Sequence, residues 1–505
     1  MYNRKKTTYN LSDHTNIIFL LFVIAATFII FYPIFSAEYL YTDEATQLWY
    51  TSKNINFATS VPQGRYITYK IFGFVFANIH TVHGVIYARL FSFLGWLICL
   101  PAWYFIINKL IIKNNLPKNL VFLSMIYIIC MPPFIIYVAW AACIEMFLGC
   151  IAALVSGYLL YEGIKIDKKP IAVSPWHMGI SILLGITALF IYQNCFGCFF
   201  IPFFIHFIAI KKITPRVYTG LLFSLVIFIL YYFLFKYSLV ALGIEASNRS
   251  AMATDPINKL LFFIARPLPA AFHFTFLMNE KSVTGVLIYL IIVAICLSIN
   301  LANKTGKSLL QKFTYLTGIF VFALLTYLPS LIVKENHSSH RTLFALDFII
   351  FLFVAETIFS SIKTVWSQSV ITACTGIFFL VTAWFNYHKQ FLEPVLYEYS
   401  IVKNFIALHY QPGITSIHFI FPSEDGFKEK YGITPSWDEF GVPSTAKKWV
   451  PEPLLQQLIF EKTGNRQIAE KTVIKCWNNK ADFDKSGEFI SNTMLLINME
   501  EALRK

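Results

Sequence analysis

The chain has 505 residues, of which 57% are hydrophobic, 17% are aromatic and only 14% are charged, and its mean hydropathy is +0.60. This composition excludes an ordinary soluble protein. The formal net charge of +13 would suit a nucleic-acid-binding protein, but the basic residues gather in alternate loops between apolar runs. That arrangement is typical of a membrane protein, so we expect no nucleic-acid partner.

Apolar runs rich in Leu, Ile and Phe recur along the chain, each near the roughly 20 residues that a helix needs to cross a bilayer. The run 196–210 is short and could be re-entrant, and the first run is interpreted as an uncleaved span because it leads straight into a polar loop. Together the runs predict an α-helical polytopic membrane protein. The eleven predicted spans are 17–35, 86–107, 119–137, 142–160, 176–192, 196–210, 217–235, 283–301, 313–333, 342–360 and 369–387.

Lysine and arginine cluster at the N-terminus and in the loops that follow every second span. The clusters lie at 4–6, 109–118, 165–169, 211–216 and 304–312, whereas the loops 138–141 and 193–195 carry no basic residue. Basic loops stay in the cytoplasm. We therefore expect a cytoplasmic N-terminus in an inner (plasma) membrane, with the first loop and the C-terminal tail on the outer, periplasmic side.

The first outer loop, 36–85, gathers polar residues within an otherwise apolar chain. Asp43 and Glu44 lie just past the first span, where a carboxylate stays hydrated enough to ionise and can still meet a bound substrate. The pair could instead cap a surface helix. Farther along the loop, apolar residues at helical spacing within 67–75 predict an amphipathic helix on the bilayer surface.

Further candidate residues lie on the same predicted outer face. Arg89 opens the second span and either snorkels to the lipid headgroups or binds a phosphate. Glu145 lies about one turn inside the fourth span, where an acid is costly and usually faces a cavity or a partner. The remaining candidates for phosphate or substrate binding lie in outer loops and are Gln63, Arg65, Tyr192, Gln193, Arg266, His340 and Arg341.

Patterns that could bind a metal are weak. His337 and His340 form an isolated HxxH, which we interpret as a pair of solvated loop histidines. Eight of the nine cysteines fall in or beside spans, so no disulfide framework is implied. The CxxC at Cys195 and Cys198 is expected to pack in the membrane rather than to bind a metal.

From Lys389 onward the composition becomes that of a soluble protein, which predicts a transmembrane domain over 1–388 and a small α/β domain over 389–505. Segments 414–421, 472–477 and 494–498 predict strands, and 453–462 predicts a helix ended by Gly464. The acidic turn 437–441 is interpreted as a structural or docking element. We expect this domain to close over the outer cavity or to recruit an acceptor.

Several of these residues carry a resemblance to the GT-C superfamily of polytopic membrane glycosyltransferases, over roughly residues 1–390. The resembling elements are the acidic pair Asp43-Glu44, the Gly64-Arg65 of the long outer loop, the Ala88-Arg89-Leu90 that opens the second span, and Glu145 at the start of the fourth. The Pro62-Gln63-Gly64-Arg65 element and Tyr192-Gln193 also resemble bacterial glucosyltransferases that modify O-antigen. The second acid of the family is often Asp, so Glu145 departs from the pattern.

The resemblance implies transfer of a sugar from a polyprenyl-phosphate donor to a glycan, lipid or protein acceptor in cell-envelope polysaccharide biosynthesis. It implies Asp43 as general base, with Glu44 and Glu145 as further catalytic acids. The resemblance leaves open whether Asp43 and Glu145 hold a divalent metal, Mg²⁺ or Mn²⁺. The alternatives are a polytopic polysaccharide polymerase or ligase, and a transporter or flippase of lipid-linked sugars, which would carry ionisable residues along a path through the spans.

Overall fold

The computed structural model describes residues 13–51, 57–165, 172–279, 282–302, 308–488 and 491–504. The basic residues of 4–6, together with Lys168, Lys169, Lys304 and Lys307, lie outside these ranges. The alternation of charge across the membrane is therefore a prediction from the sequence alone.

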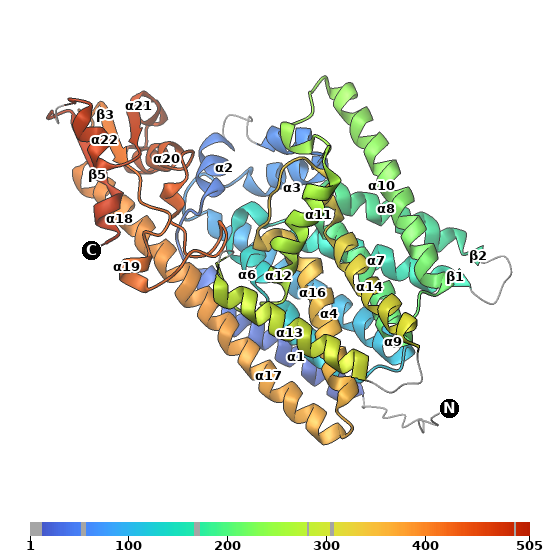
Figure 1. Ribbon diagram of the computed structural model, residues 1–505. Helices are drawn as coiled ribbons and strands as arrows, with labels where there is room; N and C mark the ends of the chain where they lie inside the picture. The colour runs from blue at the N-terminus through green and yellow to red at the C-terminus, as the bar shows by residue number, and fades with distance from the viewer. Residues whose placement is uncertain are drawn as a thin grey trace.

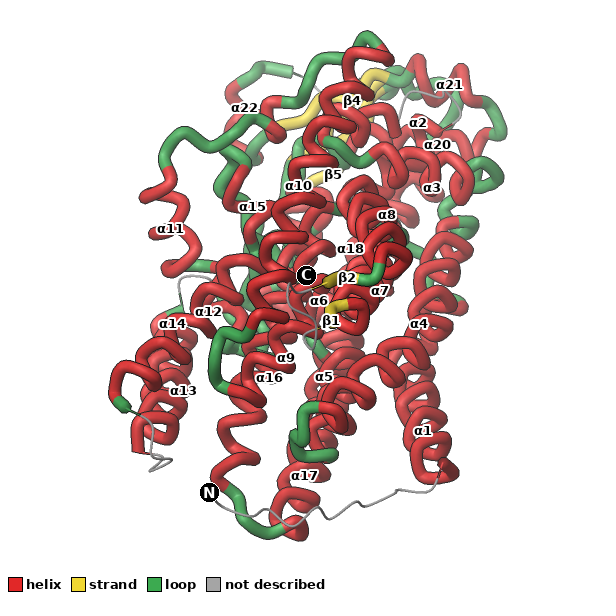
Figure 2. Tube along the Cα trace, turned by 90° about the vertical axis from the view of Figure 1, so that its right-hand side faces the viewer, coloured by secondary structure: helices red, strands yellow, loops and turns green. Residues whose placement is uncertain are grey.

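Nine helical segments of the described residues are long and apolar enough to cross a membrane, as expected for a helical membrane protein. They are Thr15–Phe35, Val85–Lys113, Ala141–Gly163, Gln193–Ile210, Pro215–Leu242, Val283–Ala302, Leu309–Thr326, His340–Ser361 and Val365–His409. Figures 1 and 2 show them as α1 (Asp13–Phe31), α4 (Val85–Lys113), α7 (Met146–Gly163), α9 (Ile201–Ile210), α10 (Pro215–Leu242), α13 (Val283–Ala302), α14 (Leu309–Thr326), α16 (His340–Ser361) and α17 (Val365–Phe385).

The other two predicted spans differ from the expectation. The run 119–137 is two helices, α5 (Asn119–Cys130) and α6 (Pro132–Ala139), which meet at 47°. Two consecutive prolines after Met131 explain the bend, because they lack backbone N–H donors and force the preceding residue into an extended conformation. The run 176–192 is α8 (Pro175–Ile191), whose 17 residues make it one of the shorter apolar helices.

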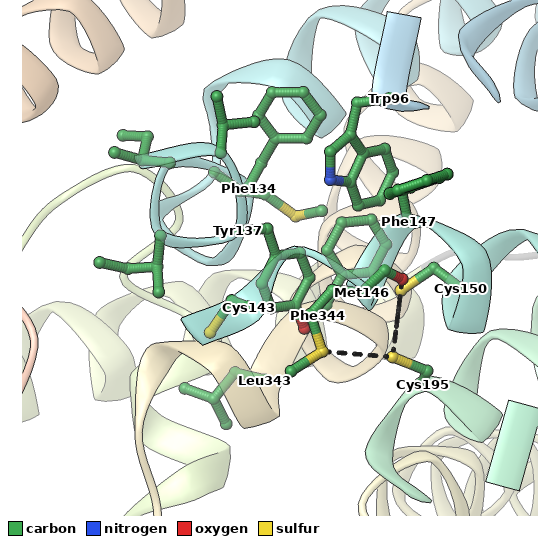
Figure 3. Packing of buried hydrophobic residues seen from close by; sticks show 14 of the residues in the cluster. Trp96, Phe134, Tyr137, Cys143, Met146, Phe147, Cys150, Cys195, Leu343 and Phe344 are labelled. Carbon is green, nitrogen blue, oxygen red and sulfur yellow. Dashed lines mark hydrogen bonds between the residues drawn. The ribbon is translucent and has the colours of Figure 1, made fainter. Parts of the chain in front are cut away.

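Helix α16 is predominantly apolar and is buried along almost its whole length. It packs against α5, α6 and α14 and against the 3₁₀ segment η4 (Gln193–Phe200). Aromatic rings fill the space beside it: Phe344 of α16 stacks on Trp96 and Tyr137 with centroids 5.5 and 5.6 Å apart, as Figure 3 shows. The same cluster holds Cys195 against Cys150, with sulfurs 3.5 Å apart, so this cysteine packs in the core as expected.

The loop between the first two spans contains α2 (Asp43–Thr51), the 3₁₀ segment η2 (Phe57–Gln63) and α3 (Tyr66–Phe76). Helix α3 confirms the helix expected over 67–75, and it buries Thr68, Phe72 and Phe76 while Phe74 stays exposed. The long loop after α10 contains α11 (Pro256–Ala265) and α12 (Pro267–Ala271), and α15 (Leu328–Ile332) precedes α16. Strand β1 (Ile164–Lys165) pairs antiparallel with β2 (Ala172–Val173).

The C-terminal part contains a parallel three-stranded sheet in the order β4–β3–β5. Its strands are β3 (Ser416–Ile420), β4 (Val473–Trp477) and β5 (Met494–Asn498), which confirms the three strands expected there. The expected helix is α20 (Pro451–Thr463), ended by Gly464 at φ +68°. The other helices of this part are α18 (Glu393–His409), α19 (Lys428–Tyr431), α21 (Arg466–Lys471), α22 (Lys480–Lys485) and α23 (Met499–Ala502).

The predicted domain boundary at 388/389 lies inside one continuous helix. Helix α17 passes through a π-helical segment, Asn386–Leu392, directly into α18, and the whole runs over Val365–His409. A change of composition marks where a helix leaves the membrane, but it does not require the helix to end there. Figure 1 shows the C-terminal part, in orange and red, beside the blue α2, against which α20 packs.

Candidate functional site

The backbone just before Asp43 is in an unusual conformation. Thr42 has φ +42°, which a β-branched residue rarely adopts and which only a strongly determined environment maintains. Gly64, next to Arg65 in the same loop, has φ +80°, and a Cβ at this position would clash with the Tyr231 hydroxyl. Both features lie beside residues that the sequence singled out, as strained backbone near functional sites often does.

Glu44 and Arg89 form a fully buried ion pair, with exposed side-chain fractions of 0% and 1%. Glu44 also accepts hydrogen bonds from the backbone N–H of Tyr41 at 2.7 Å and of Ala141 at 2.5 Å. Arg89 donates to the Tyr39 carbonyl at 2.9 Å and stacks on the Tyr39 ring at 3.5 Å. Burial raises the pKa of Glu44, and the Arg89 charge opposes that shift.

These contacts correct the expected roles of Glu44 as a catalytic acid and of Arg89 as a snorkelling or phosphate-binding residue. The carboxylate and the guanidinium are each engaged by the protein and shielded from solvent. The geometry favours a structural link between the first outer loop, α4 and the turn that leads into α7.

Asp43, the residue before Glu44, is partly exposed. Its Oδ1 accepts a hydrogen bond from the indole N–H of Trp449 at 2.9 Å, and Trp449 belongs to the C-terminal part. Asp43 therefore remains accessible at the junction between the membrane helices and the tail. A carboxylate in this position can take a proton from a bound molecule.

Glu145 is buried, with 2% of its surface exposed, and α3 supplies its neighbour. The Thr68 hydroxyl lies 3.3 Å from Glu145 Oε1 and 2.6 Å from the Ile191 carbonyl oxygen. Glu145 Oε2 has no hydrogen-bond partner among the described residues. Arg65 and Arg341 both lie within electrostatic range of this carboxyl, so the second acid and two of the candidate arginines share one region.

Arg65 is held by the polar segment that follows α8. Its guanidinium lies 4.2 Å from the centre of the Tyr192 ring, and its Nε donates to Gln193 Oε1 at 3.3 Å. The side-chain amide of Gln193 donates in turn to the Gln63 carbonyl at 2.7 Å. Four of the predicted residues, Gln63, Arg65, Tyr192 and Gln193, are thus brought together from loops far apart in the sequence.

Arg341 lies at the N-terminus of α16, where an acidic turn of the tail docks. Its guanidinium lies over Trp140 at 4.7 Å, with Asp438 Oδ2 at 3.5 Å and Glu439 Oε1 at 3.7 Å. Glu439 also accepts from the backbone N–H of His340 at 2.6 Å and of Arg341 at 3.2 Å. A buried carboxylate there satisfies free N–H groups of the helix terminus. The turn 437–441 has the docking role expected of it.

The remaining candidates lie apart from this region or are covered. His340 is buried, with 6% exposed, and its Nε2 lies 3.0 Å from Ser436 Oγ, which corrects its interpretation as a solvated histidine. The tail covers this side chain and makes it a docking contact. Arg266 is exposed and lines a small pocket with His273 and with Trp437 of the docking turn.

Among the described residues, no group of three or more His, Cys, Asp or Glu side chains could hold a metal ion. Within the described part of the chain, Asp43 and Glu145 therefore do not form a metal-binding group with a third His, Cys, Asp or Glu side chain. A metal at these two acids stays a prediction, and no step below depends on it.

Sequence reasoning missed the tail residues that contact the site. Trp449 and Ser444 carry no motif, and they lie about 400 positions from the residues they contact, so no local pattern could have found them. Trp140 was visible only as part of a short outer hairpin. In the tail, the acidic turn 437–441 was the single signal of a contact with the site, and its Asp438 and Glu439 make the contacts with Arg341.

Comparison with protein-family models, with curated proteins and with solved structures finds no match for this chain.

The docking of the tail can be tested through the pH at which the Glu439 carboxyl loses its proton. Burial raises the pKa of this carboxyl to about 8, with Asp438 adding to the shift and Arg341 opposing it. Because the folded protein then binds this proton more tightly than the unfolded chain, the contribution to stability is present below about pH 4.5 and is lost as the pH rises to about 8. We expect Glu439→Gln to flatten the fall in melting temperature between pH 5 and pH 8.

The matched control is Glu452→Gln, an exposed acid in the first turn of α20. It should leave the pH dependence of the melting temperature as in the wild type. An unchanged pH dependence in Glu439→Gln would contradict the prediction.

Proposed function

We propose that the chain is a GT-C-type membrane glycosyltransferase. It would transfer a sugar from a polyprenyl-phosphate donor to a cell-envelope glycan, lipid or protein acceptor on the outer face of the membrane. The general base would be Asp43, and the anomeric centre would be inverted.

The observation that carries the proposal is the convergence of acids and arginines at the junction of the membrane helices and the tail. Asp43, Glu145 and Arg341 all lie within electrostatic range of the Cys143 side chain, and Arg65 lies within that range of Glu145. A reaction in which a hydroxyl loses a proton while a phosphate leaves needs a carboxylate base and cationic side chains, and Asp43, Arg65 and Arg341 would supply them.

The proposed step is a direct displacement. The acceptor oxygen bonds to the anomeric carbon, its proton passes to the Asp43 carboxylate, and the bond from that carbon to the phosphate oxygen breaks. The electron pair leaves with the lipid phosphate, whose charge Arg65 and Arg341 would stabilise through charge-assisted hydrogen bonds. Glu145 is the second acid that the resemblance implies, and α3 positions it through Thr68.

The deciding experiment offers two donors to the purified protein in liposomes. One is a polyprenyl-phosphate monosaccharide and the other a polyprenyl-diphosphate oligosaccharide, each with a simple glycan acceptor. Transfer from the first alone supports the proposal. Transfer from the second alone would favour a polymerase or ligase, and movement of the intact donor across the bilayer without transfer would favour a flippase.

Arg65 and Arg341 are expected to act on the donor rather than on the acceptor. Arg65→Ala and Arg341→Ala should each weaken donor use by about 10- to 100-fold, because a charge-assisted hydrogen bond contributes about 1.5–3 kcal/mol. The Lys variants should recover part of the loss, since they restore the charge without the planar fork. The measurement is the Michaelis constant of each substrate.

Arg249→Ala is the matched control, because Arg249 is 69% exposed and pairs only loosely with Glu335 at 3.6 Å. It should leave donor use unchanged. Unchanged donor use in both Arg65→Ala and Arg341→Ala would remove these residues from the site.

A further inference from the structure

Three consecutive residues at the start of α2 are each bonded to the tail. The Tyr41 hydroxyl donates to the Glu439 carbonyl at 2.8 Å, and the backbone N–H of Thr42 donates to Ser444 Oγ at 2.6 Å. Asp43 Oδ1 accepts from the Trp449 indole at 2.9 Å. The proposed base and the strained residue before it are therefore held by a segment that follows them by about 400 positions.

The other end of α2 is held by the same part of the chain. The Arg466 guanidinium lies 4.0 Å from the centre of the Trp49 ring and donates to the Trp49 carbonyl. Phe460 of α20 lies edge-on to the same ring, with centroids 6.4 Å apart. The tail thus contacts α2 at both ends, which fixes the direction of the helix as well as its first residue.

The tail segment that holds Asp43 is itself anchored to α18, the helix that continues α17. Glu398 of α18 is buried, with 2% exposed, and accepts hydrogen bonds from the Ser444 and Thr445 backbone N–H groups at 2.8 and 2.7 Å. It also accepts from the Thr445 hydroxyl at 2.5 Å. Since α18 continues α17, a helix that emerges from the membrane sets the position of Ser444.

Resting on the function proposed above, we infer that Ser444 and Trp449 are positioning residues for Asp43, so that the tail completes the active site. Ser444 maintains the left-handed backbone of Thr42, which directs the Asp43 side chain. An indole N–H is a donor only and cannot take a proton. Trp449 therefore occupies Oδ1 of the carboxylate and leaves Oδ2 as the oxygen that receives the proton of the acceptor hydroxyl.

The test uses the full-length protein and starts from Trp449→Phe, which keeps an aromatic ring and removes the N–H. We expect kcat to fall on the order of 10- to 100-fold, as for a lost hydrogen bond to a charged group, while the donor Michaelis constant stays the same. Ser444→Ala should lower kcat in the same way. Trp176→Phe is the matched control, since Trp176 of α8 is 74% exposed and should tolerate the change.

A double-mutant cycle separates positioning from general damage. In an Asp43→Asn background the base is already lost, so Trp449→Phe should cause no further fall in residual turnover. Equal losses from Trp449→Phe in both backgrounds would overturn the inference, and so would wild-type kcat in the single variant.

Melting temperatures distinguish failure of this inference from failure of the proposed reaction. If the wild type transfers no sugar, the proposed function fails. The energetic coupling between Trp449 and Asp43 can still be measured in the solubilised protein. Asp43→Ala and Trp449→Phe should then lower the melting temperature by less in combination than the sum of their separate shifts. Additive shifts in the melting temperature would overturn the inference that Trp449 positions Asp43, whichever reaction the protein performs.

Discussion

Replacing Asp43 by Asn is expected to lower transfer turnover by about 10²–10⁴-fold, the usual contribution of a general base. An amide cannot accept the proton of the attacking hydroxyl, yet it has nearly the shape of the carboxylate. Asn can also still accept the Trp449 hydrogen bond through its side-chain oxygen. Expression, melting temperature and donor affinity should therefore stay close to those of the wild type.

The choice of Asn separates catalysis from helix capping. Asp43 begins α2, and Asn caps a helix about as well as Asp. Glu38→Gln is the control, because Glu38 belongs to the same loop but pairs with Lys403 of α18 at 2.7 Å. Full turnover of Asp43→Asn with saturating donor and acceptor would reject Asp43 as the base and leave Glu145 as the remaining candidate acid.

Loss of either partner of the Glu44–Arg89 pair should destabilise the protein by about 3–5 kcal/mol, because it leaves a buried charge without compensation. Glu44→Ala and Arg89→Ala are therefore expected to show a strongly reduced melting temperature or a low yield of folded protein. Glu44→Ala also removes the acceptor of two backbone N–H groups, which adds to its effect.

A double variant tests that the uncompensated charge causes this loss. Glu44→Gln with Arg89→Met removes both charges and keeps an acceptor for one of the Tyr41 and Ala141 N–H groups, which bond to different oxygens of Glu44, so it should be more stable than either alanine variant. Glu393→Ala breaks the exposed pair with Lys389 and should change stability by less than about 1 kcal/mol. Wild-type melting temperatures in both single variants at Glu44 and Arg89 would reject the structural role.

Local sequence patterns predicted most of the long apolar helices and, in the tail, the three strands and α20. The short runs 416–420 and 494–498, whose residues are mostly apolar, form strands, and Gly464 ends α20 because it adopts a positive φ at low cost. The break between α5 and α6 also has a local cause in Pro132 and Pro133, although length and hydropathy alone had predicted one span.

The sequence predicted which types of residue the candidate site contains, but only some of the individual residues that it singled out lie there. Arg65 contacts Tyr192 and Gln193 as a site requires, whereas Arg266 lines a pocket that contains none of these residues and His340 is covered by the tail. A charge in an outer loop can be seen in the sequence. Which neighbour neutralises it depends on contacts between segments hundreds of residues apart.

The sequence by itself determined that this chain is a helical membrane protein with a polar loop after its first apolar helix and a strand-containing tail, because hydropathy and periodicity act over ten to twenty residues. Only the tertiary structure decided the different environments of Asp43 and Glu44. Successive residues of a helix point about 100° apart. Glu44 therefore faces Arg89 in the interior, while Asp43 faces Trp449, a residue 406 positions away that no local pattern connects to it.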